Sequence, residues 1–573
     1  MPEGGSAIVL SPSARGAPVV RSLAPDQRLM RWTLALAGVA MVVVLAAPMA
    51  MLLVRAFQDA DGAWVGLANF TVYVTTPTLA VSAWNSLWTA AVATVVVVPL
   101  AFVYAYGLTR SRMPGRGAFR AVMMVPVLAP SLLPALALIT LFGNQGLLKA
   151  WLFGGTIYGP VGIVVAQVFA CFPHAAIILA VALATADGRL YEAAEVLRAG
   201  RVRTFLTVTL PGAGYGLVSA SVVVFTMVVT DFGIPKVIGG SFNVLATDVY
   251  KQVVGQQNFN MGAVVGIVLL VPALVAFALE RWATRRRAAT MTGRAVAYVP
   301  KARLWRDLPL LLACLGIAGL LLAVVGTAFW SSLIRFWPWN LALTWDNYDF
   351  GRFDTAGWGS VWTSVKMAAW AAAVGTPVIF VIAWLVARTP QAGFLRGAVG
   401  LLVTAPLAIP GLVLGLAYIL FFNHPANPLN VLYGTLAILA LNSVVHFWTV
   451  GHLTATTALR QLDPEFEAAS ASLKVPVWTT FGRVTVPMCL PAVLEISAYI
   501  FVNAMTTVSA VIFLYGPDFK PAAVAAVQMD EAGQSSAAAA MACVILAVAL
   551  SVKIAQVGVS AVIDRTTQGW RRR

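Results

Sequence analysis

Residues 187–211 read DGRLYEAAEVLRAGRVRTFLTVTLP, and residues 463–487 read DPEFEAASASLKVPVWTTFGRVTVP. The second stretch aligns with the first at a constant offset of 276, without a gap. Each is a polar stretch between long apolar runs, and each ends in a hydrophobic residue followed by proline. The repetition indicates that one folding unit occurs twice, and that two equivalent loops are available to a pair of identical partners.

Both stretches predict a helix, a turn and a second short helix. Asp463 followed by Pro464 is a favourable helix start, because Asp caps free N–H groups and proline suits the first helical position. Gly200 and Pro476 are expected to end the first helix. The second helix then carries an aromatic residue and leads to a proline that opens the next apolar run: Phe205 and Pro211 in one copy, Phe481 and Pro487 in the other. Each loop is therefore predicted to be a rigid knob.

The composition places the chain in a membrane. Of its 573 residues, 60% are hydrophobic and only 10% are charged, whereas soluble domains are about 25% charged. The apolar runs are mostly around 20 residues or longer, which is enough for a helix to cross about 30 Å of hydrocarbon. The sequence therefore predicts an all-α polytopic membrane protein, with the first run retained because it is too long for a signal-peptide core.

Twelve spans are predicted, six in each half of the chain. They lie near residues 32–54, 87–109, 121–142, 161–185, 212–235, 261–279, 308–328, 365–387, 397–422, 431–457, 488–514 and 537–562. Because each half holds an even number of spans, the two halves must share one orientation and be related by an axis along the membrane normal.

The distribution of charge sets the predicted topology. Lys and Arg gather in short loops after every second apolar run, which is the positive-inside pattern. The net charge of +16 is thereby explained without a nucleic-acid partner, and both termini are predicted to be cytoplasmic. The predicted parts are a cytoplasmic tail 1–31, a first six-helix unit 32–280 with the loop 187–211, a basic linker 281–306, a second unit 307–564 with the loop 463–487, and a basic tail 565–573.

The repeat extends beyond the two loops. Asn85-Ser86-Leu87 matches Thr363-Ser364-Val365 at an offset of 278, and Arg110 matches Arg388 at the same offset. Further matches are Pro126 and Pro130 with Pro406 and Pro410 at 280, and Thr230 with Thr506 at 276. The whole unit is therefore duplicated.

No metal site is predicted. The four cysteines are scattered, without Cys-x-x-Cys or Cys/His spacing, so small core residues are the better interpretation. His446 and His452 are six positions apart, which does not place them on one helical face, so a metal or proton-relay site is not expected there either.

The repeated loops resemble the EAA loop of permeases from binding-protein-dependent ABC importers, written E-A-A, three residues, G, and a hydrophobic-x-Leu-Pro ending. The first copy matches at Glu192-Ala193-Ala194 and Leu210-Pro211, but Arg198 stands at the family's Gly position. In the second copy Ala468 holds the Glu position, with Glu467 one place early, and Lys474 replaces the Gly. The resemblance implies that each loop docks in a groove on an ATPase subunit through Glu192, Ala193, Ala194, Gly200, Phe205 and Pro211, and through Glu467, Ala468, Ala469, Pro476, Phe481 and Pro487.

The resemblance covers nearly the whole chain and implies two fused six-span units of the type I ABC importer permease fold in the bacterial inner membrane. It also implies two copies of a cytoplasmic ATPase and an extracytoplasmic solute-binding protein as partners. The chain lacks G-x-x-x-x-G-K-[ST], so ATP and Mg are expected on the separate ATPase. The chain is therefore expected to be a transport subunit, not an enzyme, with no cofactor of its own.

The cargo is predicted from weaker resemblances. Stretches at 141–146, 230–240, 250–259, 425–430 and 504–511 look most like permeases assigned to 2-aminoethylphosphonate uptake. Ferric iron and thiamine remain alternatives, although carboxylates or tyrosines that would suit a ferric path are not evident. From other classes, an ion-driven secondary carrier would need a paired intramembrane acid, at which only Asp231 hints, and a lipid-modifying enzyme would need a cluster of acid, base or metal ligands.

A charge at mid-membrane costs about 2.5 kcal/mol or more, so polar residues there need a reason. Asp231 and Lys236 follow the fifth span and correspond to Thr507 and Ile512 in the other half. One hypothesis is a substrate gate, with Asp231 facing an ammonium group and Lys236 a phosphonate; the alternative is a helix-break turn with hydrogen-bonded polar residues. The path residues of the first hypothesis are Thr230, Asp231, Lys236, Thr506 and Thr507.

Overall fold

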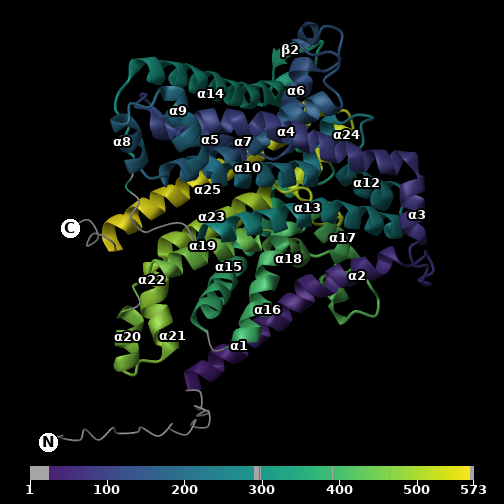
Figure 1. Cartoon of the computed structure of the whole chain (residues 1–573). Coiled ribbons are helices and arrows are strands. Elements are labelled where there is room, and N and C mark those ends of the chain that lie inside the picture. Colours follow the sequence, from purple (N-terminus) through teal and green to yellow (C-terminus); the bar gives the residue numbers. More distant parts are fainter. Residues whose placement is uncertain (1–24, 289–295, 297, 390–391, 464, 568–573) are drawn as a thin grey trace, which may run out of the picture.

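The computed structural model describes residues 25–288, 296, 298–389, 392–463 and 465–567 (Figure 1). The predicted helix start at Pro464, most of the N-terminal tail, part of the linker and most of the C-terminal tail lie outside the described residues. Within them, eight helices are long and apolar enough to span a membrane, and four bent helix pairs bring the number to twelve. The chain is an all-α polytopic membrane protein, as predicted.

The first half begins with α1 (Pro25–Met41), the π-helical turn η1 (Val42–Ala46) and α2 (Ala47–Ala56). It continues with α3 (Ala68–Thr75), α4 (Pro77–Arg110), α5 (Arg116–Leu128), α6 (Leu132–Phe142), η2 (Lys149–Leu152), α7 (Pro160–Ala184), α8 (Arg189–Val196), α9 (Arg201–Thr204), η3 (Phe205–Thr209), α10 (Leu210–Thr230), α11 (Gly233–Ile238), α12 (Leu245–Tyr250), η4 (Lys251–Gly255) and α13 (Phe259–Ala288).

The second half begins with α14 (Leu304–Ser332) and a short hairpin of β1 (Ile334–Phe336) and β2 (Asn340–Leu343). It continues with η5 (Asp346–Tyr348), η6 (Phe350–Arg352), α15 (Gly359–Arg388), α16 (Gly393–Thr404), η7 (Ala405–Ala408), α17 (Gly411–Phe422), η8 (Pro428–Leu432), α18 (Leu436–His446), α19 (Trp448–Arg460), α20 (Glu465–Ser472), α21 (Val477–Thr480), η9 (Phe481–Thr485), α22 (Val486–Met488), α23 (Leu490–Thr506), α24 (Ala522–Glu531) and α25 (Ser535–Thr567).

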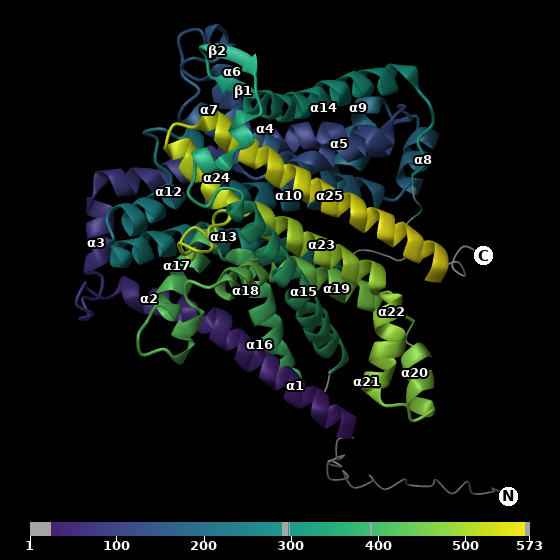
Figure 2. The same ribbon diagram turned by 180° about the vertical axis from the view of Figure 1, so that it is seen from behind.

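The first helix of each half packs on the other half. Helix α1 contacts α16, and α2 contacts α17, while α14 contacts α4 and α6 (Figures 1 and 2). The Tyr418 hydroxyl of α17 donates a hydrogen bond to the carbonyl of Val44 at 2.7 Å. Val44 lies in the π-helical turn η1, in which wider i→i+5 hydrogen bonding replaces the regular α-helical pattern. The two halves are therefore interlocked.

Two spans that were predicted as single helices, 121–142 and 397–422, are sharply broken. They bend by 98° after α5 and by 115° after η7. The residues before the repeated prolines, Ala129 and Ile409, have extended backbone (ψ 139° and 115°), which is the conformation that a following proline favours. Spans lie at both predicted positions, but neither is a continuous helix, because Pro130 and Pro410 interrupt them.

Two further predicted spans are also bent, and two end early. The span at 431–457 bends by 55° between α18 and α19, and the span at 488–514 bends by 74° between α22 and α23. Helices α10 and α23 end at Thr230 and Thr506, respectively, so the last residues predicted for the spans 212–235 and 488–514 are not part of those helices.

The serine repeat seen in the sequence has the same structural role in both halves. The Leu245 N–H donates to Ser86 Oγ, and the Ala522 N–H donates to Ser364 Oγ, each at 2.8 Å. Leu245 and Ala522 are the first residues of α12 and α24. Each serine thus satisfies a free N–H at the start of a short helix from another part of its own half.

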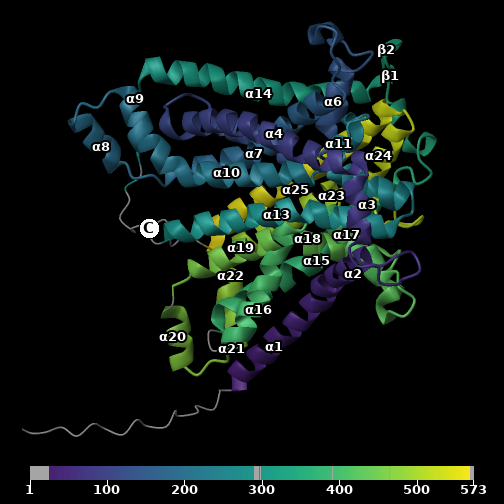
Figure 3. The ribbon, with the colours of Figure 1, turned by 45° about the vertical axis from the view of Figure 1, so that its right-hand side comes forward.

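The molecule has two distinct ends. Helices α8, α9, α20 and α21 lie at one end, and the β1–β2 hairpin, α3, α12 and α24 lie at the other (Figures 1 and 3). The long helices run between them, with the bulky side chains of Trp384, Tyr104, Phe172 and Phe232 in the core. The two repeated loops are therefore displayed on the same end of the molecule.

Candidate functional site

Both repeated loops are helix–turn–helix units, as predicted. In the first, α8 is followed by α9; in the second, α20 is followed by α21. The Arg189 N–H donates to Asp187 Oδ1, and the Glu465 N–H donates to Asp463 Oδ1, each at 3.0 Å. Equivalent aspartates therefore cap the first turn of both loops.

The break in each loop lies two residues earlier than predicted. Arg198 and Lys474 have φ of 50° and 52°, in the left-handed region, while Gly200 and Pro476 have extended backbone and precede α9 and α21. The prediction that Gly200 and Pro476 end the first helix is therefore wrong. Arg198 and Lys474 end the first helix of each loop, because their left-handed backbone reverses the direction of the chain.

The turns are Schellman motifs in both copies. In the first, the Ala199 N–H donates to the Ala194 carbonyl at 2.9 Å, and the Arg198 N–H donates to the Glu195 carbonyl at 3.1 Å. In the second, Val475 donates to Ser470 at 3.0 Å and Lys474 to Ala471 at 3.1 Å. This motif places its left-handed residue where glycine is the usual choice, which accounts for the family's Gly at these positions.

The second helix of each loop is anchored by an aromatic ring. The Phe205 ring lies 6.0 Å from the ring of Phe102 and 6.3 Å from that of Tyr106, both on α4. The Phe481 ring lies 6.0 Å from Phe380 and 4.4 Å from Trp384, both on α15. Both rings therefore face a membrane helix of their own half.

The following prolines also have equivalent places. Pro211 and Pro487 lie in the first turn of α10 and α22, directly after the π-helical turns η3 and η9. Proline cannot donate a backbone hydrogen bond and crowds the preceding turn, which favours the wider π turn before it. Each loop is therefore continuous with the helix that leads into the membrane.

The remaining loop residues differ in exposure. Glu192, Ala193, Ala468 and Ala469 are exposed, and Ala194 is buried. Glu467 is half-buried, and its Oε1 lies 2.7 Å from Nε of Arg388 at the end of α15. Glu467 therefore joins the second loop to its own membrane helix.

Two exposed leucines at the loop tips were missed by sequence reasoning. Leu197 is 80% exposed and Leu473 is 76% exposed, and each precedes the left-handed residue of its loop. The sequence did carry a signal, because the two leucines match at the same offset of 276. An apolar side chain displayed at both tips suits contact with another protein.

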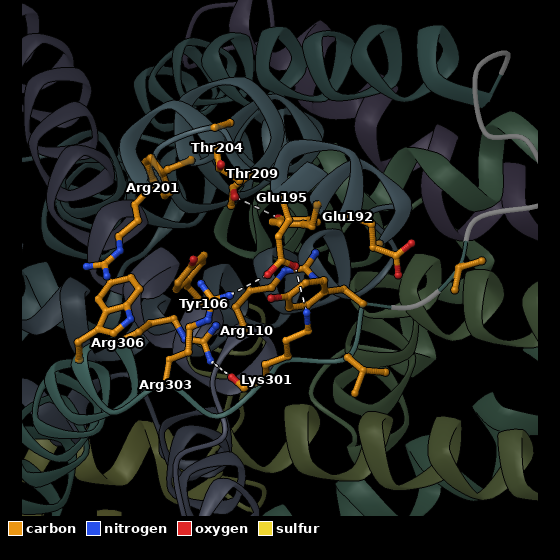
Figure 4. Close-up of a pocket in the computed structure, with 18 residues that line it drawn as sticks. Tyr106, Arg110, Glu192, Glu195, Arg201, Thr204, Thr209, Lys301, Arg303 and Arg306 are labelled. Carbon is orange, nitrogen blue, oxygen red and sulfur yellow. Dashed lines mark hydrogen bonds and ion pairs between the residues drawn. The ribbon is translucent and has the colours of Figure 1, made fainter. Parts of the chain in front are cut away.

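The linker covers the first loop. The Gly188 N–H donates to the carbonyl of Val296 at 2.8 Å, and Glu195 forms ion pairs with Lys301 at 3.0 Å and Arg303 at 3.2 Å. The hydrogen bond and charge of Lys301 lower the pKa of the Glu195 carboxyl. A cavity of about 550 Å³ lies between the linker and this loop (Figure 4).

A second cavity, of about 430 Å³, lies between the two halves. Four of the five predicted path residues line it: Thr230, Asp231, Thr506 and Thr507. Asp231 and Thr507 follow the ends of α10 and α23 with the same backbone angles, φ −71° and ψ 134°. The broken spans also contribute, through Pro126, Ser131, Pro406 and Gly411. The duplicated helix ends thus meet around one polar space.

Asp231 is held by hydrogen bonds within the protein. Its Oδ2 accepts from Gln167 Nε2 at 2.8 Å and from the Ile234 N–H at 3.1 Å. The two interpretations of the sequence therefore coincide at this residue, which is in a helix-break turn and also lines the cavity.

Lys236, the fifth predicted path residue, is not among the residues that line this cavity. Its ammonium group forms an ion pair with Glu531 and lies 4.6 Å from the centre of the Tyr250 ring. The structure therefore separates it from the other four residues.

Three further side chains line the central cavity without having been predicted there: His174, His446 and Tyr499. Within the described residues, Nδ1 of both histidines is buried without a hydrogen-bond partner. His446 ends α18, directly before the bend of this span, so its position depends on a break that the apolar pattern does not reveal. Asp231 and Tyr499 place a carboxylate and a phenol on the wall of this cavity. No group of three or more His, Cys, Asp or Glu residues suited to hold a metal ion occurs in the described part of the chain.

Two interlocked helical units that meet at a polar cavity, with two equivalent loops on one end, are the arrangement expected of the membrane-spanning subunit of an ABC importer. Residues 97–289 and 379–564 each match the family described as the inner membrane component of binding-protein-dependent transport systems. The chain belongs to this family and carries two copies of its repeat.

Similar proteins include both two-unit and shorter permeases. A protein of Haemophilus influenzae named as a ferric transport system permease is 31% identical over 441 residues, 74% of this chain and 68% of that protein. The ferric transport system permease of Actinobacillus pleuropneumoniae is 29% identical over 476 residues, 80% of this chain and 68% of that protein. A molybdenum transport system permease of Azotobacter vinelandii is 32% identical over 198 residues, 33% of this chain and 88% of that protein.

Proposed function

We propose that this chain is the permease of an importer whose cargo is ferric iron. The observation that carries the proposal is its similarity, over about three quarters of its length, to two proteins named as ferric transport permeases. This supports the ferric alternative above the phosphonate interpretation, and thiamine remains a further alternative.

The central cavity is the proposed passage. A hard cation prefers oxygen ligands, and the cavity offers the Asp231 carboxylate and the Tyr499 hydroxyl, with the His174 and His446 imidazoles nearby on its wall. Since these groups come from both halves, movement of one half against the other would change the spacing of the groups around the cargo. Alternating access at this cavity is the proposed mechanism.

The two loops are the proposed docking points for a pair of ATPase subunits, which would carry the ATP and Mg. Support comes from the exposed Glu192, Ala193, Ala468 and Ala469, and from the leucines at the two tips. On this proposal the end with α8 and α20 faces the cytoplasm, as do both termini. The opposite end, with the β1–β2 hairpin, would receive the solute-binding protein.

Phosphonate is the rival cargo. Its case depended partly on Lys236, whose ammonium group has Glu531 as an ion-pair partner and does not line the central cavity. The relatives cited above carry the names of ferric and molybdenum permeases. These observations lower phosphonate below ferric iron as a candidate.

The deciding experiment is uptake into proteoliposomes that contain this chain, its candidate ATPase and its candidate binding protein. We expect ATP-dependent uptake of ⁵⁵Fe(III) and no uptake of labelled 2-aminoethylphosphonate. Uptake of the phosphonate alone would reverse the assignment of cargo. Ferric uptake that follows an ion gradient and ignores ATP would contradict the importer mechanism.

Variants connect the cargo to the cavity. Asp231→Asn and Tyr499→Phe should each lower ferric uptake at least tenfold while the ATPase still binds to the membrane subunit. Glu495→Gln is the matched control, because Glu495 is also a carboxylate of the membrane region but does not line the cavity. Normal uptake by both cavity variants at normal expression would exclude the proposed passage.

A further inference from the structure

Two equivalent arginines have different partners in the two halves. Arg110 ends α4 and Arg388 ends α15, at an offset of 278. Arg388 forms an ion pair with Glu467 at 2.7 Å. The position equivalent to Glu467 in the first loop is Tyr191, at the offset of 276. The second half therefore supplies a carboxylate to its arginine where the first half supplies an aromatic ring.

Arg110 is buried without an anionic partner among the described residues. It is 2% exposed, and its guanidinium carbon lies 4.8 Å from the ring centre of Tyr191 and 4.6 Å from that of Tyr298. One of its terminal nitrogens donates to the carbonyl of Leu183 at 2.6 Å, while its Nε has no partner in the described part of the chain. Burial of a cation is unfavourable unless an anion compensates it, so this arginine lacks one partner.

Arg110 lines the cavity of about 550 Å³ under the linker, together with four other basic residues and two acidic ones (Figure 4). Most of these charges already have partners. Glu195 pairs with Lys301 and Arg303, and Arg306 pairs with Asp307 at 2.9 Å. What remains are two cations, Arg110 and Arg201, and one exposed carboxylate, Glu192.

Arg201 occupies the other side of the cavity. Its guanidinium lies 3.5 Å from the ring centre of Trp305, and it has no ion pair within the described residues. Stacking on an aromatic face fixes the plane of a guanidinium and leaves its N–H edge available to a ligand. Both arginines line the same cavity, Arg201 with a guanidinium stacked on Trp305 and Arg110 with a buried guanidinium beside the rings of Tyr191 and Tyr298.

We propose that this cavity binds an anion that bears a phosphate group, with Arg110 and Arg201 as its ligands. Guanidinium groups bind phosphate oxygens through paired N–H donors, and the cavity is within the size range of small-molecule sites, about 300–1,000 Å³. The cavity lies beside the ends of α4 and α14, so the phosphate can come from the head group of an anionic phospholipid or from a soluble phosphate compound.

The bound anion replaces the missing carboxylate and joins three elements. Arg110 belongs to α4, Arg201 to α9, and Trp305 to the start of α14. An occupied cavity fixes the first loop to the linker, whereas the second loop has its own carboxylate, Glu467, and needs no ligand. Phosphate-bearing anions should therefore stabilise the first loop and not the second. The proposed site does not depend on which cargo the importer carries.

The test uses the thermal unfolding midpoint of the full chain, purified in detergent. Two probes separate the sources: sodium phosphate against sodium chloride at equal ionic strength, and phosphatidylglycerol against phosphatidylcholine in mixed micelles. We expect the midpoint to rise with phosphatidylglycerol and not with sodium phosphate if the ligand is a lipid head group, and to rise with sodium phosphate if the ligand is a soluble phosphate compound. No rise with either probe would overturn the proposal.

Variants locate the effect in the cavity. Tyr191→Glu gives the first half the carboxylate of the second half, and it should abolish the rise caused by the anion, while Tyr191→Phe should retain it. Arg201→Gln, at an exposed position, should lower the rise by at least half, and Arg388→Gln should leave it unchanged. An undiminished rise in both Tyr191→Glu and Arg201→Gln would mean that the anion binds elsewhere and would contradict the proposal.

Discussion

Arg198 and Lys474 have a backbone conformation that suits glycine better than any other residue. A left-handed φ of about 50° brings the Cβ of an L-residue close to the following carbonyl oxygen, which costs roughly 1–2 kcal/mol. Both copies of the loop thus have a basic residue at a strained, left-handed position. In each copy this residue follows an exposed leucine, Leu197 or Leu473. A long basic side chain at each turn can reach acidic groups on a docking partner, which offers a reason for keeping it.

The first prediction concerns these two residues. Arg198→Gly and Lys474→Gly should each raise the free energy of unfolding by about 1 kcal/mol, because glycine removes the backbone strain. The same changes should weaken the complex with the ATPase and reduce its salt dependence. Thermal unfolding of the isolated chain and binding at two salt concentrations measure these effects.

Gly482→Ala is the control for the loop, because Gly482 lies in the helical turn η9 and nothing lies within 4 Å of its Cβ position. It should neither weaken the complex with the ATPase nor change the salt dependence of that complex. Unaltered complex stability and salt dependence in the Arg198→Gly, Lys474→Gly double variant would show that the basic residues do not pair with the ATPase.

Among the elements, the linker contact on α8 depends on a surface carboxylate. The pKa of Glu195 is lowered by the hydrogen bond and charge of Lys301 and by Arg303. A carboxyl with a lowered folded-state pKa stabilises the folded contact above its unfolded pKa, and this contribution is lost as the pH falls through the folded pKa. The contact should therefore be intact at neutral pH and weaken only in the acid range, below about pH 4.

The second prediction follows from the lowered pKa of Glu195, which means that acid weakens the contact between the linker and α8. Hydrogen exchange of residues 298–306 should quicken, relative to the intrinsic rate, as the pH falls through the acid range. Glu195→Gln should show the quickened exchange already at pH 7 and little further change with acid. Equal protection of wild type and Glu195→Gln at pH 7 would show that the ion pairs do not hold the linker.

The third prediction concerns the packing of α10 on α7. A Cβ at Gly216 would lie 2.3 Å from the Cβ of Ala182, so the two helices can be this close only with glycine there. Gly216→Ala should lower the free energy of unfolding by about 1–3 kcal/mol through overpacking. Gly316→Ala on α14 is the matched control, since nothing lies within 4 Å of its Cβ position; it should be neutral or stabilising, and an equal loss in both variants would exclude the packing explanation.

The elements also show what could be predicted from the sequence. Apolar length and the repeat predicted the number of spans and both helical loops, because these features depend on local residues. The breaks at Pro130 and Pro410 were not predicted, although these prolines had been recognised as part of the repeat, because a run of apolar residues does not reveal its own bend. That His174, His446 and Tyr499 line one cavity was not predicted for a related reason: their meeting depends on how distant helices pack around those breaks.

At the scale of the whole molecule, the two halves hold each other through exchanged helices. Helices α1 and α2 belong to the first half by sequence but pack on α16 and α17, and α14 of the second half packs on α4 and α6. The interface is mostly apolar, with polar links such as the hydrogen bond from Tyr418 to Val44. Neither half has its full set of neighbours without the other.

The fourth prediction tests this interlocking. A chain divided within residues 289–295 and co-expressed as two pieces should reassemble in the membrane and co-purify through a tag on one piece. Removal of residues 1–56 from the first piece should reduce recovery of the second at least severalfold, because α16 and α17 lose their neighbours. Equal recovery with and without these residues would contradict the importance of the exchange.

The exchange of first helices also constrains the order of events during synthesis. Helix α2 leaves the ribosome early, but its neighbour α17 follows only after more than 350 further residues. At about 5–20 residues per second, α2 waits roughly 20–70 s in the bilayer before its partner exists. Until then α2 can pack only on elements of its own half, such as α13, so the nascent chain must tolerate an incomplete set of neighbours around α2 until the ribosome is well into the second half.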